Sequence, residues 1–230
     1  AGTYFPKENQ FGRPGFKTLL TQVAKEWKDR GPEIITNSGK IVAALKQIHG
    51  ASQAGEILPR NRVATAANEV FRAFDTEHGG IASGSNKFPP SLASDLLLRE
   101  YHDSGELRYL SVVEKTLERM GNGGIYDHLG GGIARYSTDR KWLVPHFEKM
   151  LYDQALVAST YLDALQATNN SQLGAFFDEK ARGILEYVLH NLTDAEGAFY
   201  SSEDADSENL EGKFYIWTRQ EILDVLGNQD

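Results

Sequence analysis

Apolar residues recur at helical spacing along most of the chain. Positions three and four apart share one face of an α-helix, so a stripe of this kind predicts an amphipathic helix. Two such helices are expected before residue 50, one over residues 16–28 and one from Pro32 to about Ile48, because proline is favoured at a helix start. Residues 2–6 instead favour a short strand, because two aromatic residues suit a pleated surface and a proline follows them.

A small, polar segment over residues 50–61 separates this part from the rest and contains Pro59. Six further apolar stripes follow it and predict six helices. They cover Val63–Phe74, Leu92–Tyr101, Leu107–Met120, Leu151–Leu165, Phe177–Leu192 and, as the start of the last helix, Ile222–Leu226. The pattern therefore predicts a mainly α protein with one domain over residues 1–55 and a second over residues 56–230.

Three glycine-rich connections between these helices are similar to one another. They begin at Thr76, Gly121 and Thr193, and each contains Gly-Gly-Ile or Glu-Gly-Ala before a polar or aromatic stretch. Such repetition is typical of stacked helical hairpins whose long loops gather on one face. Because long loops on a rigid scaffold often carry functional residues, we expect a site at this end of the helices.

The composition excludes several kinds of partner and chemistry. The 24 basic and 32 acidic residues give a net charge of −8, which argues against a nucleic-acid-binding surface. No apolar run is long enough to span a membrane, so we expect a soluble protein. We also expect it to be inside the cell, in the cytoplasm or a mitochondrion. The lack of cysteine excludes disulfides, thiolate ligands and a cysteine nucleophile within this chain.

The most crowded polar segment is "GGGIARYSTDRKWLVPHFEKMLYDQA", residues 130–155. We expect a helix to begin just after His146, so that Asp153 lies about two turns further on the same side and Glu148 pairs with Tyr152. Imidazole groups titrate near neutral pH and suit proton transfer, whereas paired carboxylates suit glycoside cleavage. The predicted catalytic residues are His128, His146, Asp127, Glu148 and Asp153.

Aromatic and polar residues near these groups predict contacts with a substrate. Trp142 and neighbouring tyrosines could stack on a sugar ring, and acidic residues further along could line a polar cleft. The predicted substrate-binding residues are Tyr126, Arg135, Trp142, Tyr152, Asp204 and Asp206. Simpler interpretations stay open: His146 can be a structural histidine, Lys149 and Asp153 can form a surface ion pair, and the aromatic residues can belong to the core.

Neither a cofactor nor a metal is expected. The run of glycines at residues 130–132 lacks the spacing of a dinucleotide-binding fingerprint and instead favours positive φ or a close backbone approach. Asp204, Asp206 and Glu208 alternate as they would in a cation-binding loop. However, an EF-hand needs further ligands and a glycine at set spacing, which this segment does not provide.

Four stretches of the sequence, "AGTYFPKE", "GGIYDHLGGGIARYSTDRKWLVPHFEKMLYDQA", "DADSE" and "EGKFYIWT", resemble the spermatogenesis-associated protein 20 family. The resemblance implies a thioredoxin-like domain followed by an alpha/alpha toroid of the six-hairpin glycosidase type, related to N-acylglucosamine 2-epimerases. It also implies that residues 1–55 are the C-terminal part of the thioredoxin-like domain, whose cysteine-containing redox motif lies upstream. Residues 56–230 would then be the first half of the toroid.

This resemblance leads to two hypotheses about function. In the first, the protein is carbohydrate-active, epimerase-like or glycosidase-like, and acts on a sugar by proton transfer through histidine and carboxylate groups. In the second, the toroid binds a ligand or a protein without catalysis, and the thioredoxin-like part is a recruiting module. The expected partners are a small carbohydrate and, because half a toroid exposes two apolar flanks, the remainder of the same polypeptide or a second copy.

Overall fold

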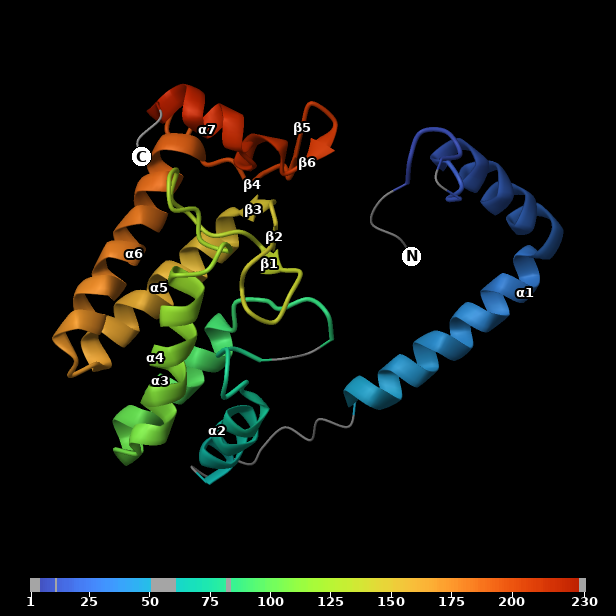
Figure 1. The fold of residues 1–230 in the computed structure, drawn as a ribbon. Helices are drawn as coiled ribbons and strands as arrows, with labels where there is room; N and C mark the ends of the chain where they lie inside the picture. Colours follow the sequence, from blue (N-terminus) through green and yellow to red (C-terminus); the bar gives the residue numbers. More distant parts are fainter. Residues whose placement is uncertain (1–4, 11, 51–60, 82–83, 228–230) are drawn as a thin grey trace. The chain divides into compact units, whose positions relative to one another are not determined.

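The computed structural model describes residues 5–10, 12–50, 61–81 and 84–227 (Figure 1). The chain divides into two compact units, Ala1–Ile57 and Leu58–Asp230. The linker expected over residues 50–61 lies outside the described residues except at its two ends, and both of these ends are helical. Each unit is therefore described by itself.

The first unit consists mainly of α1 (Phe16–Gly50), a run of 35 residues with two helical halves. The halves meet at Arg30, whose backbone leaves the helical region with φ −133° and ψ 19°. Pro32 explains the break, because proline lacks an N–H group and disfavours helical geometry in the residue before it. The two expected helices are confirmed, whereas the described end of the expected N-terminal strand, Phe5 and Pro6, is not in a strand.

The second unit contains the six helices that the apolar stripes predict. They are α2 (Asn61–Ala73), α3 (Ser91–Ser104), α4 (Leu107–Gly121), α5 (Leu151–Ala167), α6 (Ser171–Asn191) and α7 (Arg219–Leu226). Each stripe lies on one of these helices, apart from Phe74 and Leu192, which follow the last helical residue of α2 and α6. Among the described residues, no helix is long and apolar enough to cross a membrane.

Short antiparallel pairings order the connections between these helices. Each strand is two residues long: β1 (Tyr136–Ser137) pairs with β2 (Pro145–His146), β3 (Lys149–Met150) with β4 (Ser202–Glu203), and β5 (Asp206–Ser207) with β6 (Leu210–Glu211). A 3-10 turn, η1 (Lys213–Tyr215), follows the last strand. Because β3 and β4 come from different connections, their pairing joins segments about fifty residues apart.

The helices pack as successive hairpins around a common apolar core. α5 turns into α6 at Asn170, whose side chain accepts hydrogen bonds from the backbone N–H groups of Gln172 and Leu173 at 3.0 and 3.2 Å. α3 packs against α2, α4 and α5, and α4 also contacts α6. The fully buried core side chains include Leu97, Val113, Leu117, Tyr161 and Phe177. Burial of each large apolar side chain contributes roughly 1.5–3 kcal/mol, so this core stabilises the arrangement of hairpins.

The three glycine-rich connections lie together at one end of the helices, as predicted (Figure 1). Backbone hydrogen bonds join Lys87 in the first connection to Ser137 in the second, in both directions at 2.8 Å. The β3–β4 pairing then joins the second connection to the third. The loop end is therefore a continuous hydrogen-bonded surface, and side chains from distant parts of the sequence meet there.

Gly80 shows how closely these connections approach one another. Its φ is 71°, and a Cβ atom there would lie 2.4 Å from Cζ2 of the buried Trp142. Gly105 has a similar φ of 74° but no neighbour within 4 Å of a Cβ atom. We expect Gly105→Ala to lower the free energy of unfolding by about 1–2 kcal/mol, from backbone strain alone. Gly80→Ala should cost about 1–3 kcal/mol more, because it also overpacks the core, and denaturant unfolding of both variants measures the difference.

Candidate functional site

The extended segment 145–150 sends its side chains to two different places. Successive residues of an extended chain point to opposite faces. Pro145, Phe147 and Lys149 line a pocket, whereas His146 and Glu148 contact each other and other charged groups. The expected helix start is corrected, because this segment forms β2 and β3 and α5 begins only at Leu151. Glu148 is therefore not on the helix that carries Tyr152.

His146 lies between two carboxylates. Its Nδ1 is 2.5 Å from Oε1 of Glu211, and its Nε2 is 3.8 Å from Oε2 of Glu148. The imidazole ring stacks on the ring of Tyr136, with centroids 4.8 Å apart and an interplanar angle of 18°. The His146 side chain is 25% exposed, so it is held in place but is still accessible.

Arg135 extends this cluster on the side of Glu148. Nη1 of Arg135 is 2.8 Å from Oε2 of Glu148, and the backbone N–H of Arg135 donates to the Glu148 carbonyl at 2.8 Å. The hydrogen bond with Glu148 raises the pKa of Arg135, and the nearby Tyr152 adds to this effect. Tyr152 itself is 49% exposed, so it can still contact a ligand.

Asp153, at the first turn of α5, is the most perturbed carboxyl group of the cluster. Burial raises its pKa to about 6. Attraction to Arg135 opposes this rise, and repulsion from Glu148 adds to it. Within the described residues, Oδ2 of Asp153 and Nε of Arg135 are buried and have no hydrogen-bond partner. The structure thus brings together five of the residues predicted for the site: Arg135, His146, Glu148, Tyr152 and Asp153.

The raised pKa of Asp153 predicts a dependence of stability on pH. A carboxyl group whose pKa is higher in the folded state stabilises the fold below its unfolded pKa of 3.8, and this contribution is lost as the pH rises through about 6. Solvent screening of this partly exposed group reduces the expected loss to about 1–2 kcal/mol. Between pH 4 and pH 7, the free energy of unfolding of Asp153→Asn should therefore rise by about 1–2 kcal/mol relative to that of the unchanged protein. Denaturant unfolding at both pH values measures this difference.

Asp163→Asn is the matched control, because Asp163 is an exposed carboxylate on the same helix. We expect its unfolding free energy to follow that of the unchanged protein at both pH values. A parallel pH dependence for Asp153→Asn and the unchanged protein would contradict the prediction.

Asp127 lies on the other face of the segment, where it stabilises a turn. Its Oδ1 accepts the backbone N–H groups of Leu129 and Gly130 at 3.0 and 2.9 Å, and its Oδ2 is 2.8 Å from Nζ of the buried Lys149. Burial opposes ionisation of Asp127, but these contacts outweigh it and lower its pKa. The surface ion pair between Lys149 and Asp153 that the sequence left open is corrected to this buried pair. His128, beside Asp127, is exposed, and its Nε2 is 3.0 Å from the Gly123 carbonyl oxygen.

The glycines after Asp127 are needed for their backbone. Gly131 and Gly132 have φ of 75° and 78°, and Cβ atoms there would lie 2.5 Å from the Gly183 oxygen and 2.6 Å from the Tyr187 ring. Positive φ and a close approach, as expected from the sequence, are both confirmed.

Trp142 and Tyr126 belong to the core, which corrects their predicted role as platforms for a sugar. Trp142 has 0% exposure, and its Nε1 donates a hydrogen bond to the His78 carbonyl at 2.9 Å. Tyr126 is 6% exposed, with its hydroxyl close to Gly183. Trp142 therefore offers no surface to a ligand. Tyr126 offers only the small exposed part that lines a pocket.

Asp204 and Asp206 are exposed beside the β5–β6 hairpin. Oδ1 of Asp204 accepts the backbone N–H of Asp206 at 3.0 Å, which is a local turn contact. Neither residue is in hydrogen-bond contact with the His146 cluster. In the part of the chain that the structure describes, no group of three or more histidine and acidic side chains is arranged to hold a metal ion.

Several residues of the loop end were missed by the sequence interpretation. Glu211 reaches His146 because the β5–β6 hairpin turns the chain back, and its only signal was its place in the motif "EGKFYIWT". Glu203 accepts hydrogen bonds from the hydroxyl groups of Tyr187 and Tyr215, each at 2.5 Å. Burial first, and then these hydrogen bonds, raise the pKa of both tyrosines.

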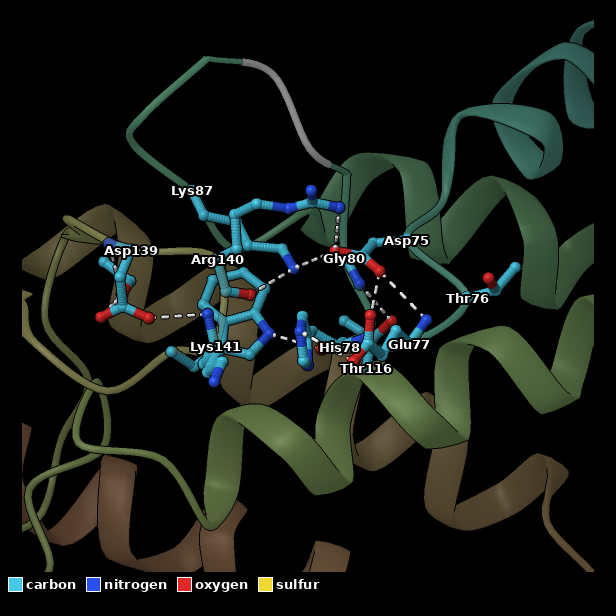
Figure 2. Close-up of polar contacts among 12 residues, drawn as sticks. Asp75, Thr76, Glu77, His78, Gly80, Lys87, Thr116, Asp139, Arg140 and Lys141 are labelled. Carbon is cyan, nitrogen blue, oxygen red and sulfur yellow. Dashed lines mark hydrogen bonds and ion pairs between the residues drawn. The ribbon is translucent and has the colours of Figure 1, made fainter.

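A buried charged network, which was also missed, connects the first two loops (Figure 2). Nζ of Lys87 lies 3.3 Å from Oδ2 of Asp75 and donates to the Arg140 carbonyl at 2.8 Å. Nη2 of Arg140 contacts the same Asp75 oxygen at 3.0 Å. Burial opposes ionisation of Asp75, but hydrogen bonds from His78, Arg140 and Glu77 outweigh it and hold its pKa far below the usual value. Burial also lowers the pKa of Lys87, against the attraction of Asp75.

Comparison with known proteins finds relatives of similar sequence. No protein-family model matches the chain. Spermatogenesis-associated protein 20 from Homo sapiens is 39% identical over 241 residues, which cover 98% of this chain and 30% of that protein. The Mus musculus protein of the same name is 37% identical, and the match again covers 98% of this chain and 30% of that protein. The resemblance to the spermatogenesis-associated protein 20 family is confirmed. The chain spans about three-tenths of the length of these spermatogenesis-associated protein 20 relatives.

The fold comparison concerns part of the chain. A crystal structure of a sugar epimerase from a ruminal bacterium matches with a TM-score of 0.51 and 17% identity, over 63% of this chain and 40% of that one. This likeness and the stacked helical hairpins confirm the predicted partial alpha/alpha toroid. The assignment of residues 1–55 to a thioredoxin-like domain stays a prediction.

Proposed function

We propose that this segment carries a proton-transfer centre of a carbohydrate-active protein with epimerase-like chemistry. The observation that carries the proposal is the position of His146 between two carboxylates, 2.5 Å from Glu211 and 3.8 Å from Glu148. The toroid fold supports it, since the matched solved structure is that of a sugar epimerase. The substrate is a carbohydrate with a free carbonyl form.

Epimerisation next to a carbonyl group removes the proton of the neighbouring carbon and returns a proton to the opposite face. Glu211 accepts a hydrogen bond from Nδ1–H of His146, which fixes the tautomer and leaves Nε2 to take the proton. The Arg135 guanidinium places positive charge where the enediolate forms. Asp153, with its pKa of about 6, still carries a proton part of the time at neutral pH and is suited to return it.

A glycosidase-like reaction needs two carboxyl groups that flank the glycosidic bond. Here Glu148 is engaged by Arg135 at 2.8 Å, so its carboxylate is already paired. Nε2 of His146 is 3.8 Å from Oε2 of Glu148, beyond hydrogen-bond distance, so the imidazole keeps a nitrogen for proton transfer, which favours the epimerase-like reaction.

A non-catalytic binding role is the second candidate. It is favoured by the hydrogen bonds that already engage both Nδ1 of His146 and the carboxylate of Glu148. In this role the same cluster would hold a polar ligand in place without moving a proton.

Hydrogen exchange separates the two candidates. The protein would be incubated in D₂O with aldoses, ketoses and N-acetylhexosamines, and the sugars analysed by NMR and mass spectrometry. Proton transfer incorporates deuterium at the carbon next to the carbonyl, and His146→Gln should slow this incorporation by a factor of about 10²–10⁴. Saturable binding of a sugar without deuterium incorporation would support the binding role, and neither binding nor incorporation would contradict both.

A further inference from the structure

The other face of the segment 145–150 lines a pocket that the His146 cluster does not use. The pocket has a volume of about 210 Å³, and Pro145, Phe147 and Lys149 form one wall. The turn over residues 124–129 forms a second wall, and Tyr215 and Trp217 close it from the third connection. Residues from three parts of the chain thus converge on a space that has no part in the proposed proton transfer.

Aromatic residues line one side of this pocket. The rings of Phe147 and Tyr215 stack with centroids 5.5 Å apart and an interplanar angle of 12°. The hydroxyl group of Tyr215 donates to Glu203 at 2.5 Å, which fixes the orientation of the ring. Trp217 lines the same pocket and is 51% exposed, so its indole ring is available to a ligand.

The polar side of the pocket offers acceptors. Nε2 of His128 is 3.0 Å from the Gly123 carbonyl oxygen, so Nε2 carries the proton and Nδ1 is left as an acceptor. Oδ2 of Asp127 accepts one hydrogen bond, from Lys149, and has room for another. Lys149 donates to Asp127 and Gly131 and otherwise faces the tyrosine rings, so its donors are already used.

We propose that this pocket binds a single pyranose ring, as a carbohydrate site separate from the His146 cluster. A pyranose presents a flat C–H face to aromatic rings and hydroxyl donors at its edge, which complements both sides of the pocket. The volume is below the roughly 300–1,000 Å³ of pockets for drug-sized ligands, so it suits one ring. The choice of a carbohydrate rests on the proposed function, whereas the position of the site rests on the pocket alone.

The charge of the surroundings narrows the ligand to an uncharged sugar. The chain has a net charge of −8, and Asp127 contributes a carboxylate to the pocket wall. Because the Lys149 ammonium is already engaged by Asp127 and Gly131, it is not offered to the phosphate of a sugar or a nucleotide, and the net negative charge of the chain disfavours both ligands. An uncharged aromatic base could still stack on the same rings, and the experiment below includes it.

Methyl glycosides are the probes that test this site. Their rings cannot open, so they have no carbonyl group and cannot be turned over at His146. Binding of methyl glucoside, methyl mannoside and methyl N-acetylglucosaminide to the protein would be measured by saturation-transfer NMR and calorimetry. We expect at least one of them to bind saturably, and Trp217→Ala to weaken its binding roughly tenfold through loss of the stacking surface.

Two controls separate this site from other effects. Trp27→Ala removes an exposed indole from the first unit and should leave glycoside binding unchanged, and so should His146→Gln. Unchanged binding in Trp217→Ala, or binding of adenine or indole but of no glycoside, would overturn the proposal. Glycoside binding without deuterium exchange of reducing sugars would uphold this site and contradict the epimerase-like reaction, so the two proposals fail separately.

Discussion

Replacing Asp75 by asparagine is expected to lower the free energy of unfolding by about 3–5 kcal/mol, because it leaves the buried Lys87 ammonium without a countercharge. Lys87 and Asp75 have side chains that are only 2% and 3% exposed. Asparagine keeps the size of the side chain and an oxygen for the backbone N–H groups of Glu77 and His78, so the charge is the main change. Urea unfolding at neutral pH measures the effect.

Two further variants test whether the buried charge is the cause. Arg140 also contacts Asp75, but its side chain is 62% exposed, so Arg140→Gln should cost no more than about 1 kcal/mol. The double variant Asp75→Asn/Lys87→Met removes both buried charges and should recover part of the stability that Asp75→Asn loses. An equal loss in Arg140→Gln and Asp75→Asn, or no recovery in the double variant, would contradict this explanation.

The helices of the second unit could be predicted because their apolar faces repeat in the sequence itself. The stripe of α4, for example, places Leu110, Val113 and Leu117 at helical spacing, and all three are buried. The approximate end of α1's first half was also predictable, because Pro32 restricts the backbone locally. Such signals need only neighbouring residues, so a single sequence contains them.

The contacts of the site were predicted only in part, because they depend on pairings between distant segments. The sequence placed Glu148 on a helix, since helical spacing to Tyr152 was visible and the pairing of Lys149 with Glu203 was not. It missed Glu211 for the same reason, because a hairpin 65 residues after His146 brings it into contact. Trp142 was misassigned because an aromatic residue in a polar, glycine-rich segment looks exposed until the fold covers it.

The cover of the toroid's apolar flanks stays a prediction. Within the second unit, Phe177 and Ile184 of α6 are buried, whereas Leu185 and Leu189 on the same helix are 45% and 63% exposed. We propose that the remainder of a longer polypeptide, or a second copy of the chain, covers these residues.

His146→Gln is expected to reduce proton transfer by a factor of about 10²–10⁴, the usual contribution of a positioned acid–base group. Glutamine can still donate a hydrogen bond to Glu211, so the fold and the neighbouring side chains should be retained, but it has no group that takes up a proton near neutral pH. The rate of deuterium incorporation into a responsive sugar is the measurement, with thermal unfolding as the check on folding. His102→Gln is the matched control, because His102 is an exposed histidine on α3 and its replacement should leave the rate unchanged.

If Glu211 acts by positioning the imidazole, Glu211→Gln should shift the pH profile of the exchange rate as well as its maximum, which a loss of folded protein alone would not do. A His146→Gln variant that exchanges deuterium at the rate of the unchanged protein would assign the proton transfer to another residue of the cluster, with Asp153 as the next candidate.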